Sequence, residues 1–222
     1  MLNKLKNLKE HIAQGKNAMS FDMSRFNDPL AEQIQWTPVQ SGGSSFAAQN
    51  LTEINPNRFE LKPTLQSKLF SFVFMGVGIA VPLFFIPDID FGNEDAMLSL
   101  GFLSIFGLLF AASGFFTLRK FSKPTVFDKS IGKFWKGKNG PDKKPDLMNS
   151  ELVYDLDKVY AIQLLSEYVR SDKNSYYIFE LNFVMDDTKR LNILRQGGKA
   201  KIKKNAETLS KFLNKPIWDA AG

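Results

Sequence analysis

Two uncharged stretches dominate the sequence: residues 69–86 read LFSFVFMGVGIAVPLFFI, and residues 96–118 read AMLSLGFLSIFGLLFAASGFFTL. At about 1.5 Å of rise per residue, they would form helices about 27 and 34 Å long, against a bilayer hydrocarbon core of about 30 Å. Nine residues, 87–95, separate them. The pattern predicts two membrane-spanning helices that form an antiparallel hairpin over residues 68–118.

The charges around these stretches predict the orientation of the hairpin. Lys68 precedes the first stretch, Arg119 and Lys120 follow the second, and the loop 87–95 has four acidic residues but no Lys or Arg. Cytoplasmic loops of membrane proteins carry the excess of Lys and Arg. We therefore expect both termini in the cytoplasm and the loop 87–95 in the periplasm or outside the cell.

Small residues within the two stretches predict how the helices pack. In lipid, Gly and Ala allow two helix backbones to approach closely. We expect a helix–helix interface formed by five small residues: Gly76, Ala80, Gly107, Ala111 and Gly114. The alternative is that the same residues form a dimer contact. Neither stretch contains an ionisable side chain, which argues against an ion path within this protein alone.

The amino-terminal part of the chain divides into two predicted segments. Apolar residues recur at helical spacing in residues 1–18, with lysines on the other faces: Lys4, Lys6 and Lys9. This predicts a basic amphipathic helix that lies on an anionic membrane or docks on a partner, with a frayed, solvated end as the alternative. Residues 19–67 contain SGGSS and NPN and have no sustained period. They predict a disordered linker.

In residues 119–222, apolar and polar residues alternate, and turn residues separate the alternating runs. They predict a hairpin of strands at 125–127 and 133–136, long strands at 158–170 and 175–185, and a strand at 190–194. A helix follows over about residues 199–213, with an apolar stripe along one side, and Asn214 and Pro216 end it. An antiparallel sheet covered by one helix is an α+β architecture.

Three stretches carry a family resemblance: DLDKVYAIQLLSE at 155–167, YYIFELNFVMDDTKRLNIL at 176–194 and FLNKPIWD at 212–219. With them, residues 125–219 resemble the bacterial PH-like domain, and the chain resembles two-span bacterial membrane proteins that carry such a domain. The resemblance implies a membrane protein of the α+β class in the bacterial inner membrane. Its cytosolic domain, over residues 119–222, would be a bent antiparallel sheet capped by a carboxy-terminal helix.

PH domains bind anionic lipid headgroups through basic residues on the first hairpin of the sheet. This chain has three lysines at comparable positions: Lys133, Lys136 and Lys138. The resemblance thus implies an anionic-membrane contact at these side chains. The alternative is simple solvated charge, because Asp142 and Asp146 follow closely and no arginine accompanies the lysines.

The sequence indicates no catalytic, cofactor or metal site. It contains no Cys and one His, His11, which excludes thiolate chemistry and multi-histidine metal sites. The acidic pairs at 155/157 and 186/187 fall at predicted turns. No phosphate-binding glycine motif or nucleic-acid-binding motif occurs, so we expect neither a nucleotide nor a nucleic-acid partner.

The expected function is therefore that of a non-enzymatic inner-membrane scaffold or assembly factor. It would tether a protein-binding PH-like domain to the cytoplasmic face and meet a protein partner within a membrane complex. Two alternatives share the same visible features. One is an immunity protein that neutralises a membrane-acting toxin, and the other is an accessory subunit of a larger membrane complex.

Overall fold

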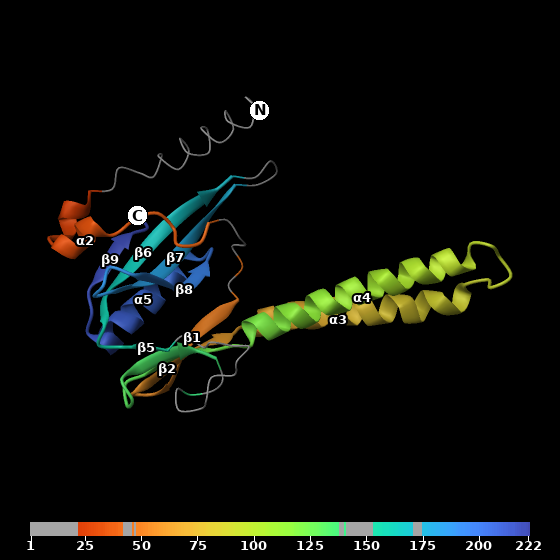
Figure 1. The fold of residues 1–222 in the computed structure, drawn as a ribbon, viewed down its shortest axis with the longest axis horizontal. Helices are drawn as coiled ribbons and strands as arrows, with labels where there is room; N and C mark the ends of the chain where they lie inside the picture. Colours follow the sequence, from red (N-terminus) through yellow and green to blue (C-terminus); the bar gives the residue numbers. More distant parts are fainter. Residues whose placement is uncertain (1–21, 42–45, 47, 138–139, 141–152, 171–174) are drawn as a thin grey trace, which may run out of the picture. The chain divides into compact units, whose positions relative to one another are not determined.

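The computed structural model describes residues 22–41, 46, 48–137, 140, 153–170 and 175–222 (Figure 1). The chain divides into two compact units. The terminal unit combines Met1–Phe46 with Asp157–Gly222, and the central unit is Ala47–Leu156. The sequence predicted one carboxy-terminal domain over 119–222. The structure instead places a boundary between Leu156 and Asp157, because the first strands after the helices complete a sheet that begins before them.

The central unit contains a five-stranded antiparallel sheet in the order β1-β2-β3-β4-β5. Its strands are β1 (Gln49–Asn55), β2 (Arg58–Pro63), β3 (Thr125–Asp128), β4 (Lys133–Lys136) and β5 (Val153–Asp155). The predicted hairpin at 125–136 is present as β3 and β4. In contrast, β1 and β2 lie in the segment 19–67, for which the sequence predicted a disordered linker.

Two long helices are inserted between neighbouring strands of this sheet. Only Thr64 separates β2 from α3 (Leu65–Phe85), and three residues separate α4 (Ala96–Phe121) from β3. A short 3-10 helix, η2 (Ile86–Asp88), follows α3. Strands β2 and β3 nevertheless pair directly, with Leu61 opposite Thr125. The helices lie side by side as a hairpin whose two ends attach to paired strands (Figure 1).

Both helices are long and apolar enough to span a membrane. The spans are Leu65–Asp88 and Ala96–Arg119, and only 11% of the most apolar window in each is buried. Large apolar side chains along them are exposed, among them Leu83, Phe102 and Leu108. A core helix of a soluble domain would bury such residues, so within the described residues this exposed apolar surface favours a location in an apolar environment.

The terminal unit contains a four-stranded sheet in the order β8-β7-β6-β9. Its strands are β6 (Val159–Val169), β7 (Tyr176–Met185), β8 (Arg190–Gln196) and β9 (Ile217–Ala220). The three predicted strands pair antiparallel, and α5 (Lys199–Leu213) follows them as predicted. Strand β9 was not predicted; it pairs parallel to β6. The α+β class is confirmed, whereas the PH-like arrangement stays a prediction.

The two faces of this sheet have different covers. Helix α5 lies along one face and contacts β6, β7 and β8 (Figure 1). Side chains alternate along a strand, so Leu181 and Phe183, both buried, point to one face, and Glu180, Asn182 and Val184 point to the other, where Val184 packs against Ala31. Residues 22–41 cover that face, and they include η1 (Met23–Phe26) and α2 (Pro29–Gln33).

Candidate functional site

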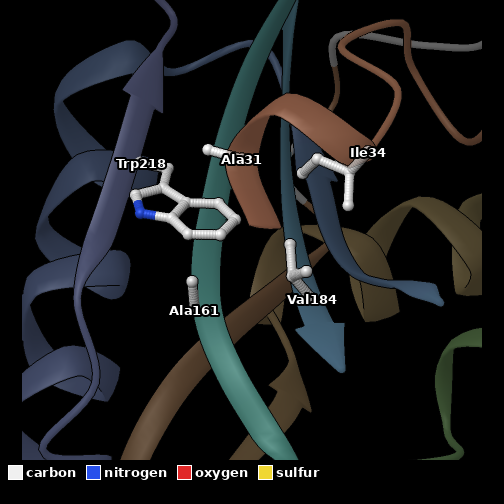
Figure 2. Close-up of a cluster of buried hydrophobic side chains, with 5 residues drawn as sticks. All are labelled: Ala31, Ile34, Ala161, Val184 and Trp218. Carbon is white, nitrogen blue, oxygen red and sulfur yellow. The ribbon is translucent and has the colours of Figure 1, made fainter. Parts of the chain in front are cut away.

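Residues 22–41, called the strap here, cross the sheet face opposite α5. Aspartates begin its two short helices: Asp22 accepts the N–H of Ser24 at 3.0 Å, and Asp28 accepts that of Leu30 at 2.9 Å. A cluster of buried apolar residues, each at most 7% exposed, joins α2 to the sheet: Ala31, Ile34, Ala161, Val184 and Trp218. Figure 2 shows α2 passing over β6, with the Trp218 indole lying between α2 and Ala161.

Aromatic rings add to the attachment of the strap. Phe26 stacks on Trp36 with a centroid distance of 5.1 Å and an interplanar angle of 8°. The two rings approach Trp218 of β9, with centroid distances of 5.9 and 6.2 Å. The Trp36 indole N–H donates to the Ala31 carbonyl at 2.8 Å. Aromatic pairs of this kind contribute about 0.5–1.5 kcal/mol each beyond their buried area.

Four polar side chains of the sheet contact the main chain of the strap and are called the cradle: Gln163, Glu180, Arg190 and Arg195. The Glu180 carboxylate is 1% exposed and accepts the N–H groups of Val39 at 2.7 Å and Gln40 at 3.2 Å. Arg195 donates to the same carboxylate at 3.0 Å and also to the Gln40 carbonyl. These donors compensate the cost of burying a carboxylate.

The other two cradle residues bind carbonyl groups further back in the strap. Arg190 Nη1 donates to the Thr37 carbonyl at 2.7 Å, and Gln163 Nε2 donates to the Gln35 carbonyl at 3.0 Å. Burial lowers the pKa of Arg190, while the charge of Glu180 acts in the opposite direction. Most of these contacts go to main-chain atoms of the strap, and Arg190 Nη2 also donates to the Gln35 side chain at 3.3 Å. The backbone bends at Thr37, Val39 and Gln40, so the cradle binds main-chain groups of a bent segment.

A second set of hydrogen bonds holds the cradle from within the sheet. Asn182 donates to Glu180 at 2.7 Å and to Gln163 at 3.3 Å, and it accepts from Asn192 at 3.1 Å. Glu167 of β6 forms an ion pair with Arg195. The cradle side chains are thus oriented by residues of β6, β7 and β8, and this support does not involve the strap.

Two further contacts hold the beginning of the strap. The Tyr160 hydroxyl donates to the Asp28 carboxylate at 2.9 Å, and this hydrogen bond raises the pKa of Tyr160. Arg25 donates to the Asp219 carbonyl of β9 at 2.6 Å. The strap is therefore fixed to the sheet by side chains of β6 and by the edge strand β9.

The chemistry of this site is that of binding. The cradle offers two guanidinium groups, one carboxylate and one amide, all engaged in hydrogen bonds to backbone groups. Within the described ranges, no group of three or more His, Cys, Asp and Glu side chains is placed to hold a metal ion. The arrangement can hold a peptide segment in a fixed register.

The lysines predicted to contact an anionic membrane are not brought together in the described residues. Lys133 and Lys136 are three positions apart on β4, so they point to opposite faces of the strand. Lys133 forms an ion pair with Asp155 of β5 at 2.7 Å. The remaining predicted contacts, Lys4, Lys6, Lys9 and Lys138, lie outside the described residues, as does the amphipathic helix predicted at 1–18.

The predicted helix–helix interface differs in part from the observed one. A Cβ added at Gly107 would lie 2.5 Å from the Gly78 carbonyl oxygen, and one added at Gly78 would lie 2.4 Å from the Ala111 backbone nitrogen. Gly114 lies equally close to α3. Gly76 and Ala80, however, are exposed. Residues two apart on a helix lie about 200° apart around its axis, so Gly78 and Gly76 cannot share one face.

Sequence reasoning missed the cradle. In YYIFELNFVM, Glu180 and Asn182 alternate with apolar residues, a pattern that usually indicates one solvent-facing side of a strand. Here a segment 140 residues earlier in the chain covers that side. One available signal was the recurrence of Phe26, Leu30 and Ile34 at every fourth position, which is typical of a segment that packs on another element.

No family model matches the chain, and no curated protein or solved structure matches it.

Proposed function

We propose that this protein is a non-enzymatic scaffold or assembly factor of the bacterial inner membrane that binds protein on the cytoplasmic side. In this proposal α3 and α4 span the membrane, both termini are cytoplasmic, and the loop 87–95 lies on the other side. The observation that supports it most is the insertion of an exposed apolar hairpin between the paired strands β2 and β3.

The insertion supports an anchor with a fixed orientation. Since β2 and β3 are adjacent and antiparallel, α3 and α4 attach to the same end of this strand pair. Lys68 and Arg119 lie near that end, whereas the distant loop contains only acidic charges, such as Asp88 and Glu94. Positive charge at the sheet end favours a cytoplasmic location for the sheet.

A tethered binding protein needs only weak contacts with its partner. Confinement to one bilayer raises the effective concentration of each molecule for the other, so that individually weak interfaces become occupied. The cradle favours a protein ligand over a lipid headgroup, because it binds a peptide backbone through Glu180 and two arginines. The first-hairpin lysines Lys133 and Lys136 do not converge.

Topology is tested with alkaline phosphatase fusions, which are active only outside the cytoplasm. A fusion after Asn93 should be active and one after Gly222 inactive, and alkaline carbonate should leave the full-length chain in the membrane fraction. An active fusion after Gly222, or extraction by carbonate, contradicts the anchor.

The scaffold role is tested by photo-crosslinking in intact cells. A photoreactive amino acid at exposed positions of the terminal unit, such as Tyr177 and Glu207, should trap a membrane-protein partner. The same positions in a chain released from the membrane by deletion of 65–121 serve as the control and should trap far less. Equal trapping by both chains contradicts tethering.

A further inference from the structure

We propose that the cradle is a binding site for peptide segments, and that the strap occupies it as an exchangeable ligand from the same chain. The inference rests on the proposed protein-binding function and names the chemistry of the partner segment. That segment carries an aromatic side chain at the position of Trp36 and has free main-chain N–H groups three and four residues later, where the strap backbone bends.

The contacts define which groups such a segment must present. Glu180 requires N–H donors at the positions of Val39 and Gln40, so proline is excluded there. Proline is accepted at position 38, where it also favours extended backbone at Thr37. The aromatic side chain at position 36 enters the ring cluster with Trp218. The buried Ala31 and Ile34 require small or apolar side chains at their positions.

The cradle is preorganised, which is what an exchangeable ligand requires. Arg195 keeps its ion pair with Glu167, and Asn182 keeps its hydrogen bonds to Glu180 and Gln163, whatever occupies the face. A site held in its binding geometry by its own framework loses little conformational entropy when a new segment arrives.

The strap itself is held mainly by these side-chain contacts. Its helices contain only four and five residues, too few to be stable alone. In the described part of the chain, the strap contributes no strand to the four-stranded sheet. Its buried apolar residues are Ala31 and Ile34, and Phe26, Leu30 and Trp36 pack against the same cluster. A segment that is not paired into a sheet can open separately from it, so a partner segment that supplies equivalent apolar and polar contacts can replace the strap without unfolding the sheet.

The test converts the strap into a separable ligand within the full-length protein. A protease site is placed within residues 42–45, the protein is purified in mild detergent, and the chain is cut. The probe is a labelled synthetic peptide of residues 22–41. We expect the cut amino-terminal fragment to stay bound, and excess peptide to displace it with a rise in fluorescence anisotropy.

Matched peptides test recognition of the main chain. N-methylation at Val39 removes the N–H that Glu180 accepts and should weaken binding at least about tenfold, because hydrogen bonds to charged groups contribute that much. Val39→Ala keeps the N–H and should bind within about threefold of the parent peptide. In the protein, Glu180→Gln should weaken binding at least about tenfold, and Glu207→Gln on the outer face of α5 should not.

Three results would overturn the inference: a fragment that leaves after cutting while the peptide fails to bind, a fragment that peptide cannot displace, or equal binding of the N-methylated peptide. The peptide series uses the wild-type cradle, so it decides the question even where Glu180→Gln does not fold. No membrane partner enters these measurements. Exchange without partner trapping therefore refutes the scaffold role alone, and partner trapping without exchange refutes this inference alone.

Discussion

Substitution of Glu180 by Gln measures how much the Glu180 carboxylate contributes to the free energy that holds the strap on the sheet. Val39 donates to Oε1 of Glu180, whereas Gln40 and Arg195 donate to Oε2. The new amide replaces one of these oxygens with a donor N–H₂ group, so at least one of the donors loses its acceptor. Removing one partner of a buried ion pair costs about 3–5 kcal/mol. We expect the lower end, about 3 kcal/mol, because Arg195 retains its ion pair with Glu167 and the Gln side chain retains one acceptor.

The assay is hydrogen exchange of the backbone amides of Val39 and Gln40. A loss of about 3 kcal/mol in the free energy of strap opening accelerates their exchange by about two orders of magnitude, since about 1.4 kcal/mol is a factor of ten. Amides within β7 should change much less. Glu207→Gln removes an exposed carboxylate and should leave both amides unchanged. Unaltered exchange at Val39 and Gln40 in Glu180→Gln would refute the assignment of the carboxylate as the main attachment.

Further perturbations address the hairpin and the sheet. Gly107→Ala should destabilise the hairpin by about 1–3 kcal/mol in denaturant titrations, because its Cβ would lie 2.5 Å from the Gly78 carbonyl, whereas Gly76→Ala, with nothing within 4 Å, should not. Trp218→Ala should remove about 3–5 kcal/mol and lower the melting temperature seen by calorimetry, and an unchanged value would contradict its burial. The hydrogen bond to Asp28 raises the folded-state pKa of Tyr160 above 10.0. The hydrogen bond therefore stabilises the strap fully below that pH, and this stabilisation is lost as the pH rises through the folded-state pKa. Tyr160→Phe should therefore show faster strap exchange than wild type near neutral pH, with the difference vanishing well above pH 10, and a difference independent of pH would count against the hydrogen bond.

The sequence was most informative where its pattern is long and local. The uncharged stretches at 69–86 and 96–118 lie within the helical spans that the structure contains, and the boundaries of α5 were predicted from its apolar stripe and the residues that end it. A helix signal accumulates over several turns of contiguous residues, so distant partners are not needed to detect it.

The remaining elements depend on contacts between distant parts of the chain. Strand β1, QNLTEIN, has no strong alternation, and β2 pairs with β3 across the whole inserted hairpin. The strap is buried against strands more than 120 residues later in the sequence. Spacing alone favoured the wrong glycine for the helix interface. Gly76 has Ala80 four residues later and Gly78 has no small residue at that spacing, but only the partner helix decides which face is buried.

The attachment of the hairpin to the sheet explains why small residues are also buried between the helices near that end. Adjacent strands lie about 4.8 Å apart, whereas packed helices usually lie 8–10 Å apart. With one residue between β2 and α3 and three between α4 and β3, the helices must approach closely near the sheet. Ser67 and Ser71 are buried there, and a Cβ at Gly114 would lie 2.6 Å from the Ser71 carbonyl oxygen. A larger side chain at Gly114 would force the helices apart about two turns from the sheet, close to the paired Leu61 and Thr125, so we expect helix packing and strand pairing in the central unit to be coupled.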